Sequence, residues 1–305
     1  VLAIAFEPVW ATFSFGQVNL IVLALCLLDL TGRHRARGVM VSLAAGLKLT
    51  PLFFVAYLVF TRQFRAAATV CATFAATVAV GFMFNPHGAA VFWTDAVRDP
   101  SRVGSAFFAG NQALTGVLPR WAGGPLPHAV VLVAQALAGL AALVAASYLH
   151  RRGHELESVI AASFGMLAMS PISWSHHWVW AWPAALVLVA ALVRQLRGAR
   201  GGNGEHAADD VDHGDARGIG AAERAPGWAV ATGALLMLWL FVFVSRSTWW
   251  PPHYEDAELS WSLVQKVLGN TYVVAGALWI AWALLDARAG RRGRNVASFA
   301  PRGGE

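Results

Sequence analysis

The chain has 305 residues, of which 57% are hydrophobic and 13% are charged, and its mean hydropathy is +0.53. Soluble domains carry about 25% charged residues, so this composition excludes an ordinary soluble domain and indicates a multi-pass membrane protein. The formal net charge of +6 requires no nucleic-acid partner, because the arginines lie in short clusters between apolar runs, as in the cytoplasmic loops of membrane proteins.

The first 30 residues contain Glu7 in a short segment, followed by an apolar run that ends at Leu30. Neither a charged n-region nor a cleavage site follows Val1, so no targeting segment is predicted, and we expect the protein to begin upstream of this residue. The run is short for a membrane span of about 20 residues, which places Gln17 and Asn19 in its first turns. Amides at that position either contact a ligand or lie at the membrane interface.

Residues 39–60 are long enough to cross a membrane, but Lys48, Thr50 and Pro51 interrupt their centre. A charged side chain at this depth is costly unless it faces a partner or water. Pro51 also disfavours helical geometry at Thr50. We therefore predict two half-helices, 39–47 and 51–60, that return to the side from which they came, with the break facing protein or water.

The remaining apolar runs predict further spans at about 64–84, 128–148, 157–170, 177–194, 227–245 and 267–286. If 39–60 returns, the clusters of arginine share the cytoplasmic side, and the exceptions are Arg98, Arg102, Arg120 and Arg246. If 39–60 crossed, every later basic loop would face outward, against the positive-inside rule. The sequence thus predicts an all-α, polytopic transmembrane helix bundle with a broken, re-entrant pair at 39–60. Its polar segments 16–19, 85–127, 170–178 and 246–266 would share the external face.

The segment 85–127 is a long loop with several unexplained polar residues, among them G-N-Q-A-L at 110–114 and Arg120. A loop of about 40 residues in a compact protein is more often functional than decorative. Its Trp93 and Phe107-Phe108 indicate a short amphipathic helix in the membrane interface.

The junction S-P-I-S-W-S-H-H-W at 170–178 lies between two apolar runs and carries two adjacent imidazoles. Pro171 should end the preceding helix near Met169 or Ser170. Trp and neutral His are also common as interface anchors, so a purely structural role is the alternative. No acidic residue is nearby, and Cys26 and Cys71 lie inside apolar runs, so we expect an anionic or sugar ligand and no metal ion.

The chain divides into a membrane domain with the external polar site, at 1–196, and a C-terminal transmembrane hairpin at 227–287. Between them, 197–226 has almost no large apolar residue and is predicted to be a disordered cytoplasmic linker. Residues 288–305 form a basic tail. The aromatic, acidic stretch 249–256 is predicted to be a surface element, and the alternative is that it covers a lipid or sugar site.

Four motifs, F-G-Q-V-N at 15–19, G-L-K-L-T-P at 46–51, G-N-Q-A-L at 110–114 and S-P-I-S-W-S-H-H at 170–177, together resemble glycosyltransferase family 87 over residues 5–285. Members of that family are integral-membrane C-type glycosyltransferases, including polyprenyl-phosphate-mannose-dependent α-(1,2)-mannosyltransferases. The resemblance implies an inverting transfer of a mannosyl or other hexosyl unit. The donor would be a polyprenyl-phosphate sugar, and the acceptor would be a glycolipid or glycan. The transfer would take place on the external face of the plasma membrane.

Such a transfer needs a carboxylate that takes the acceptor proton and cationic groups that stabilise the departing phosphate. The resemblance implies a catalytic acid in an external loop upstream of this chain, and Glu7 is the carboxylate left near the site. The expected catalytic residues are therefore Glu7, His176 and His177. The expected substrate-binding residues are Gln17, Asn19, Lys48, Asn111, Gln112, Arg120 and Ser173. Neither a cofactor nor a divalent metal is indicated.

Two other classes of protein remain open on the residues alone. A flippase or other transporter for lipid-linked sugars would also use broken helices and buried cations. A non-catalytic membrane protein would carry the same polar residues as interface anchors. The clustering of the motifs on one predicted face favours the enzyme, because a carrier needs access from both sides.

Overall fold

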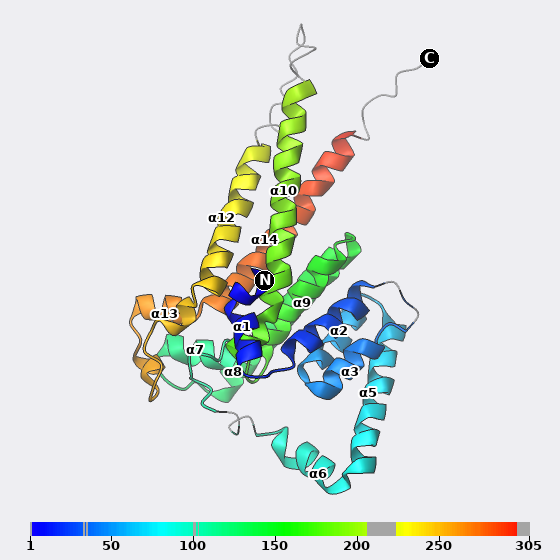
Figure 1. Cartoon of the computed structure of the whole chain (residues 1–305), viewed down its shortest axis with the longest axis vertical. Coiled ribbons are helices and arrows are strands. Elements are labelled where there is room, and N and C mark those ends of the chain that lie inside the picture. The colour runs from blue at the N-terminus through cyan, green and yellow to red at the C-terminus, as the bar shows by residue number, and fades with distance from the viewer. Residues whose placement is uncertain are drawn as a thin grey trace.

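The computed structural model describes residues 2–32, 34, 36–99, 102, 104–205 and 224–297, and the side chains of all of these except 199–205, 224–226 and 290–297. In this part of the chain the structure consists of helices, turns and loops without a strand (Figure 1). The predicted all-α bundle is confirmed.

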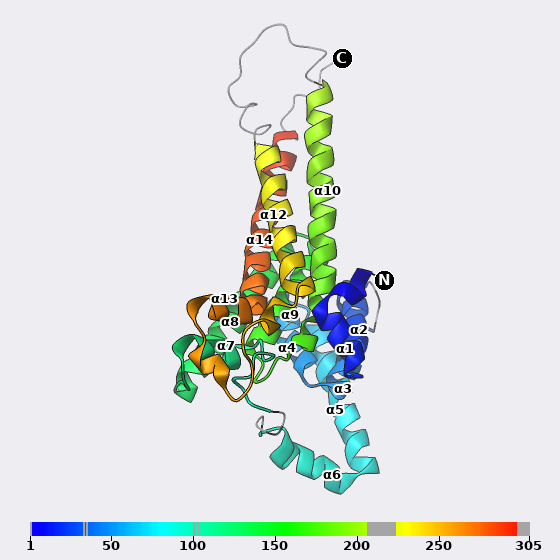
Figure 2. The same ribbon diagram turned by 60° about the vertical axis from the view of Figure 1, so that its left-hand side comes forward.

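Five helical stretches within the described residues are long and apolar enough to cross a membrane. They lie in α5 (Phe64–Phe84), α8 (His128–Arg151), α10 (Ala181–Glu205) with the turn before it, α12 (Arg224–Val244) and α14 (Thr271–Ala297). Each coincides with a predicted span, which confirms a multi-pass membrane protein. Figures 1 and 2 show α10, α12 and α14 running side by side, away from the remaining helices.

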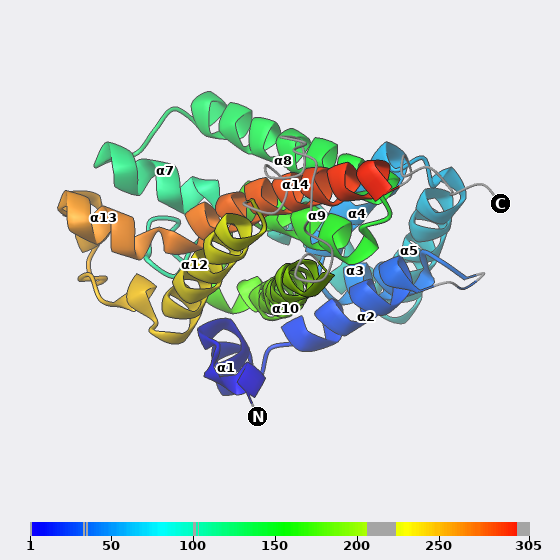
Figure 3. The ribbon, with the colours of Figure 1, turned by 90° about the horizontal axis from the view of Figure 1, so that it is seen from above.

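The fifteen-residue helix α9 (Glu155–Met169) is the centre of the bundle and matches the predicted span 157–170. Seen from above, α8, α14 and α10 surround it (Figure 3). Every residue from Ser158 to Ala168 is buried. A helix that is apolar on all sides is expected in such a buried position.

The predicted re-entrant pair is confirmed as α3 (Val39–Leu47), the turn η2 (Thr50–Leu52) and α4 (Phe53–Phe60). The chain is extended at Lys48, with φ −156° and ψ 123°, and this breaks the helix where the sequence places Pro51. At the start of α3, Gly38 faces the carbonyl of Ala66 near the start of α5. Since α4 ends four residues before α5 begins, both outer ends of the pair lie at the same end of α5.

The start of α3 is fixed by a buried carboxylate from α2 (Asn19–Thr31). Asp29 accepts hydrogen bonds from the backbone N–H of Gly38, at 2.8 and 3.0 Å to its two oxygens, and of Val41 at 2.8 Å. Helix N-termini leave such N–H groups without partners, and a side-chain acceptor satisfies them. Gly38 has φ +105°, and a Cβ there would lie 2.6 Å from the carbonyl oxygen of Ala66, so this turn requires glycine.

The other helices of the described chain are short and lie mostly in the predicted polar segments. They are η1 (Leu2–Ala5), α1 (Glu7–Ser14), α6 (Pro86–Val91), the π-helix η3 (Phe92–Ala96), α7 (Leu114–Ala122), η5 (Ser175–Trp180), η6 (Ser247–Trp249), η7 (Ala257–Ser260) and α13 (Leu263–Gly269). In Figure 1, α6, α7 and α13 lie at the end of the molecule opposite the far ends of α10 and α14. The helices of the predicted polar segment 85–127, and α13 at the end of segment 246–266, therefore lie toward the same end of the molecule.

Helix α10 continues to Glu205 and α12 starts at Arg224, so both extend into the predicted linker 197–226, of which 206–223 lies outside the described residues. Likewise α14 continues to Ala297 within the predicted tail, and 298–305 lies outside the described residues. Asp286 joins the three helices, because its carboxylate accepts hydrogen bonds from Arg194, Gln195 and Trp228 at 2.8, 3.0 and 3.0 Å.

Replacing Asp29 by alanine should destabilise the re-entrant pair. The change leaves the buried N–H groups of Gly38 and Val41 without their acceptor, which is expected to cost about 3 kcal/mol. Thermal unfolding of the detergent-solubilised protein measures this loss as a lower midpoint. Asp95→Ala is the matched control, because Asp95 is exposed and accepts a bond from its neighbour Thr94, and it should change stability by less than about 0.5 kcal/mol. Equal midpoints for the two variants would contradict the role given to Asp29.

Candidate functional site

The site begins where α9 ends, at the predicted position Met169. Ser170 takes an extended conformation, with φ −58° and ψ 145°, because a helical residue before Pro171 would clash with the proline ring. The chain then continues without helix as far as Trp174 and enters the turn η5, which carries His176 and His177. The junction thus presents both imidazoles at the end of a rigid, buried helix.

The junction is held against the loop before α7 by the side-chain amide of Asn111 and by the backbone N–H of Gln112, which donates to the Ser173 carbonyl at 2.7 Å. Both residues are fully buried. Asn111 Oδ1 accepts from the Ser173 backbone N–H at 3.0 Å, and its Nδ2 donates to the carbonyl of Ala106 at 2.9 Å. Gln112 Nε2 donates to the carbonyls of Ala109 and Gly269 at 2.8 and 2.7 Å. Both side chains therefore bind backbone from other parts of the chain.

Arg120 lies fully buried beneath the same loop. Its Nε donates to Asn270 Oδ1 at 2.8 Å, and its Nη atoms donate to the carbonyls of Phe107, Phe108 and Asn111 at 3.1, 3.0 and 2.8 Å. Burial lowers the pKa of Arg120, and the carboxylate of Glu258 raises it in part. The guanidinium thus organises the loop through its carbonyl groups, and all three of its nitrogen atoms are already bonded.

Glu7, which is 4% exposed, joins three elements through its carboxylate. Its Oε1 accepts from the Ser175 hydroxyl at 2.8 Å and from the Trp249 indole at 3.1 Å, and its Oε2 accepts from the Tyr272 hydroxyl at 2.7 Å. Hydrogen bonds to a carboxylate are stronger than neutral ones. Glu7 therefore fixes the junction, η6 and the start of α14 relative to α1.

Next to this cluster is a cavity of about 510 Å³, here called the histidine cavity. It is lined by Phe15, Gly104, Ser105, Phe108, Gly110, Trp174, Ser175, His176 and Trp249. Its walls are mainly aromatic, and its polar side chains come from two serines and one histidine. The ring of His176 meets Phe15 edge-on at 5.4 Å and His177 at 4.7 Å between centroids. Such a site suits a ligand with both apolar faces and hydroxyl groups.

A chain of hydrogen bonds connects the break at Lys48 to His176 and His177 in η5, here called the double-histidine corner. Lys48 Nζ donates to Asn19 Oδ1 at 2.8 Å, and Asn19 Nδ2 donates to the backbone carbonyl of His176 at 2.9 Å. The Thr12 hydroxyl donates to the same carbonyl at 3.0 Å. The ammonium of Lys48 also lies within electrostatic reach of the His176 and His177 rings. One amide thus places a cation beside the histidines.

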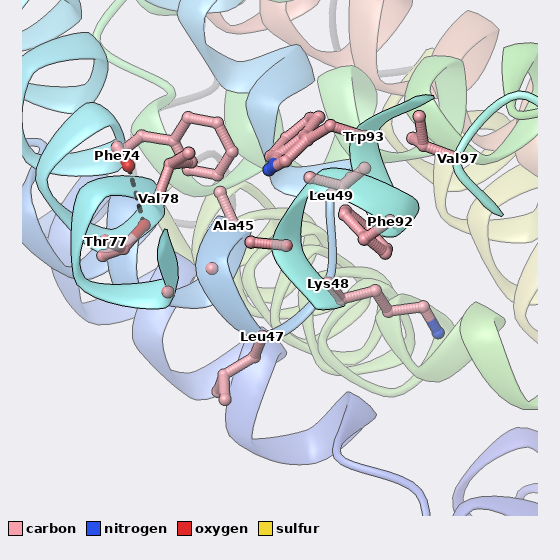
Figure 4. Close-up of a pocket in the computed structure, with 13 residues that line it drawn as sticks. Ala45, Leu47, Lys48, Leu49, Phe74, Thr77, Val78, Phe92, Trp93 and Val97 are labelled. Carbon is pink, nitrogen blue, oxygen red and sulfur yellow. Dashed lines mark hydrogen bonds between the residues drawn. The ribbon is translucent and has the colours of Figure 1, made fainter. Parts of the chain in front are cut away.

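A second cavity, of about 540 Å³ and here called the α5 cavity, lies on the other side of this break. Figure 4 shows Phe74 and Val78 of α5 facing Phe92 and Trp93 across it, with the ammonium of Lys48 pointing away from Phe74 and Val78. The remaining lining residues are Ala45, Gly46, Leu47, Leu49, Thr77, Gly81, Ala89 and Val97. The side chain of Lys48 therefore joins an apolar cavity to the polar corner.

The structure brings together most of the sequence-predicted site residues, in two layers. Lys48 and His176 border the cavities. Asn19, Asn111, Gln112, Arg120 and Glu7 lie behind them in contact with protein. The Oγ of Ser173 is buried without a hydrogen-bond partner among the described residues. His177 is half-buried and lines neither cavity, and Gln17 is exposed and also lines neither.

Sequence reasoning missed three members of this arrangement: Tyr272, Asn270 and Glu258. Glu258 Oε1 accepts from the buried N–H of Ala109 at 2.9 Å, next to the loop that Arg120 holds. Asn270 and Tyr272 stand at the start of the last span, as Asn19 stands at the start of α2. Polar residues at the first turn of an apolar helix were therefore a usable signal there as well.

Curated proteins of known activity match the chain. It is 33% identical, over 94% of its length, to the polyprenol-phosphate-mannose-dependent α-(1-2)-phosphatidylinositol pentamannoside mannosyltransferase of Mycobacterium tuberculosis, and covers 60% of that protein. The phosphatidylinositol mannoside mannosyltransferase of the same organism is 36% identical over 60% of the chain and 43% of its own length. A pentamannoside mannosyltransferase of Mycolicibacterium smegmatis is 36% identical over 65% of the chain and 49% of its own length. The chain thus spans about half the length of these relatives.

No solved structure gives a significant match. The family model of glycosyltransferase family 87 matches residues 1–173, which is more than half of the 305 residues. The match includes the motifs around Asn19, Lys48 and Asn111 and ends at Ser173, inside the motif at 170–177. The resemblance seen in the sequence is confirmed, and the chain belongs to glycosyltransferase family 87.

Proposed function

We propose that the complete protein is a membrane mannosyltransferase that moves a mannosyl unit from a polyprenyl-phosphate donor to a glycolipid acceptor. The observation that carries this proposal is the bonded chain from Lys48 through Asn19 to His176, which sets a cation beside an aromatic cavity. The names of the matched relatives supply the donor and the acceptor class. Family membership supports the reaction type.

The reaction breaks the bond between the anomeric carbon of the sugar and the phosphate oxygen, and forms a bond from that carbon to the acceptor oxygen. In an inverting transfer the acceptor attacks from the face opposite the leaving phosphate. The acceptor proton goes to a carboxylate base, and the lipid phosphate takes the electron pair and leaves with one more negative charge. A fixed cation beside the phosphate stabilises that charge as it develops.

Lys48 and the two imidazoles suit this task. The Lys48 ammonium has one hydrogen bond, to Asn19 Oδ1, and its charge acts on both histidine rings. We propose that Lys48 contacts the leaving phosphate directly and that His176 and His177 donate hydrogen bonds to it. On this proposal the protein supplies the positive charge without a divalent cation.

The histidine cavity suits the transferred sugar. Its aromatic residues Phe15, Phe108, Trp174 and Trp249 present flat apolar faces to the C–H side of a pyranose. Hydroxyl groups from Ser105 and Ser175 and the ring of His176 are available to the sugar hydroxyls. Asn111, Gln112 and Arg120 support this wall from behind and so position it.

Glu7 fits a positioning role better than that of the base. Both of its oxygens accept hydrogen bonds, Oε1 from Ser175 and Trp249 and Oε2 from Tyr272. Of these residues Ser175 and Trp249 line the cavity, while Glu7 does not. A base must reach the acceptor proton directly or through one water. We propose that Glu7 holds Ser175 and Trp249 in place and that another carboxylate of the complete protein takes the proton.

The charge distribution supports a site on the external face of the plasma membrane. Arg62 and Arg65 lie at the start of α5, and Arg151 and Arg152 at the end of α8, the end where Ser147 bonds to the carbonyl of Phe60. This is the end of α5 and α8 away from the histidine cavity. By the positive-inside rule the arginine-rich end is cytoplasmic.

Replacing Lys48 by methionine should lower transfer about 100-fold, because it removes the charge that stabilises the leaving phosphate and keeps the apolar stem. Membranes containing the full-length protein are incubated with radiolabelled polyprenyl-phosphate mannose and a phosphatidylinositol mannoside, and the α-(1,2)-linked product is measured. Lys266→Met is the control, since Lys266 lines neither cavity and bonds to the Trp121 carbonyl. No product from the wild type, or movement of the donor across vesicles without a new linkage, would overturn the proposed function.

Replacing His176 by alanine should lower kcat for the same transfer about 100-fold while the protein still inserts into membranes. The variant loses a hydrogen-bond donor that borders the sugar cavity beside Lys48. His128→Ala, an exposed histidine at the start of α8, serves as the comparison and should keep full activity. Wild-type kcat in His176→Ala would remove the double-histidine corner from the mechanism.

Glu7→Gln separates the positioning role from that of the base. The amide keeps the shape but loses one acceptor site, so kcat should fall about tenfold, while the acid limb of the pH–rate profile stays. Tyr272→Phe removes the partner hydroxyl, and the effects of the two changes should be less than additive in the double variant. Disappearance of the acid limb in Glu7→Gln, with a loss of about 1,000-fold or more, would identify Glu7 as the base.

A further inference from the structure

We propose that the α5 cavity holds the isoprenoid chain of the lipid-linked donor, with its phosphate at Lys48. The proposal rests on the proposed function, since the donor is the one named for the relatives. It assigns a lipid-binding role to α3, α5, α6 and η3, which are outside the histidine cavity.

The lining of the α5 cavity suits a hydrocarbon chain. Part of the lining consists of small residues that leave space for the chain, namely Ala45, Gly46, Gly81 and Ala89, and larger apolar side chains form the sides. The hydroxyl of Thr77 already donates to the carbonyl of Phe74 at 2.7 Å. Lys48 is the one charged residue in the lining. An apolar cavity of about 540 Å³ with a single cation at its edge fits a hydrocarbon tail that ends in an anion.

The cavity also lies where a lipid chain can enter. Helix α5 is little covered by protein, with 11% of its most apolar window buried, and Met83 and Phe84 at its end are largely exposed. Trp93 meets Phe74 across the cavity, edge-on with ring centroids 6.2 Å apart. The π-helix that carries Trp93 is a rare form that is frequent at functional sites. A lipid chain in the bilayer beside α5 is therefore next to residues that line the cavity.

The order of the groups selects the donor's chain over an acyl chain of the acceptor. In a polyprenyl-phosphate sugar the reacting carbon is bonded directly to the phosphate, which is bonded to the chain. Lys48 has the same intermediate place, since its side chain lines the α5 cavity and Asn19 links it to His176 of the histidine cavity. In a phosphatidylinositol mannoside, inositol and sugar rings separate the phosphate from the reacting hydroxyl, so its acyl chains would lie further away.

Filling the cavity tests the proposal in the full-length protein. Gly81 lines the cavity and a Cβ there would meet no atom within 4 Å, so Gly81→Trp adds an indole to the cavity lining without displacing backbone. Gly233→Trp in α12 is the matched control, since a Cβ there also meets nothing within 4 Å and Gly233 lines neither cavity. KM is measured for two donors, the long-chain polyprenyl-phosphate mannose and the short-chain geranyl-phosphate mannose.

In Gly81→Trp we expect KM for the long-chain donor to rise at least about tenfold, as when roughly two methylenes are kept out of an apolar site. KM for the short-chain donor should stay unchanged, and Gly233→Trp should change neither value. Equal KM values for the two variants with the long-chain donor would overturn the lipid site while leaving the proposed function intact. A wild type that transfers from neither donor would instead contradict the proposed function.

Photolabelling gives a second measurement that does not depend on turnover. A polyprenyl phosphate with a diazirine in its chain should label residues 64–97 in the wild type and in Gly233→Trp, and label them less in Gly81→Trp. A phosphatidylinositol mannoside with a diazirine in an acyl chain should not label this segment. Labelling by the acyl probe in place of the isoprenoid probe would assign the cavity to the acceptor and overturn the proposal.

Discussion

The ammonium of Lys48 is the group on which this arrangement depends. It stands in an otherwise apolar stretch of a membrane protein, where a charge without a partner is costly. Two features of the structure offset that cost. The helix breaks at Lys48, and the side-chain oxygen of Asn19, at the first turn of α2, accepts a hydrogen bond from the ammonium at 2.8 Å. Lys48 is half-buried, and because Asn19 also bonds to the backbone of His176, the bond that satisfies this charge fixes the relation between three elements.

The other buried polar groups near the cavities follow the same principle, with partners far away in the sequence. Glu7 bonds to Ser175, Trp249 and Tyr272, and Arg120 bonds to Asn270 and to three carbonyls of its own loop. Buried polar groups that have all their hydrogen-bond partners make a site rigid. Removal of one partner leaves a buried polar group unpaired, which costs folding free energy. These residues therefore form a supporting layer, while His176, Ser175 and the stem of Lys48 face the cavities.

The features with local causes could be predicted from the sequence. Pro51 and Lys48 predict the break in 39–60, and Pro171 predicts the end of α9. The break and the helix end both lie where they were predicted. The roles within the site depended on distant contacts. Arg120 was predicted to bind substrate, and in the structure its nitrogens bind Asn270 and three carbonyls whose positions no local pattern reveals. Tyr272 lies 265 residues from Glu7 in the sequence, so their bond had no sequence signal.

Gln17 and Asn19 show the same limit at a finer scale. Both are amides in one motif, yet α2 begins at Asn19, so Asn19 turns inward and Gln17 stays exposed in the preceding turn. The motif identified the right segment, and the helix boundary decided which amide reaches the interior.

The choice of an amide at position 19 has a consequence for charge. An aspartate there would pair with Lys48 and cancel its charge toward any other anion, and it would lose the N–H that bonds to the His176 carbonyl. Asn19 instead bonds through both ends, and among the described residues no carboxylate forms an ion pair with Lys48. The ammonium is thus held in position while its charge remains uncompensated by the protein. A cation kept in that state, between an apolar cavity and a polar one, is suited to an anion that arrives with a ligand.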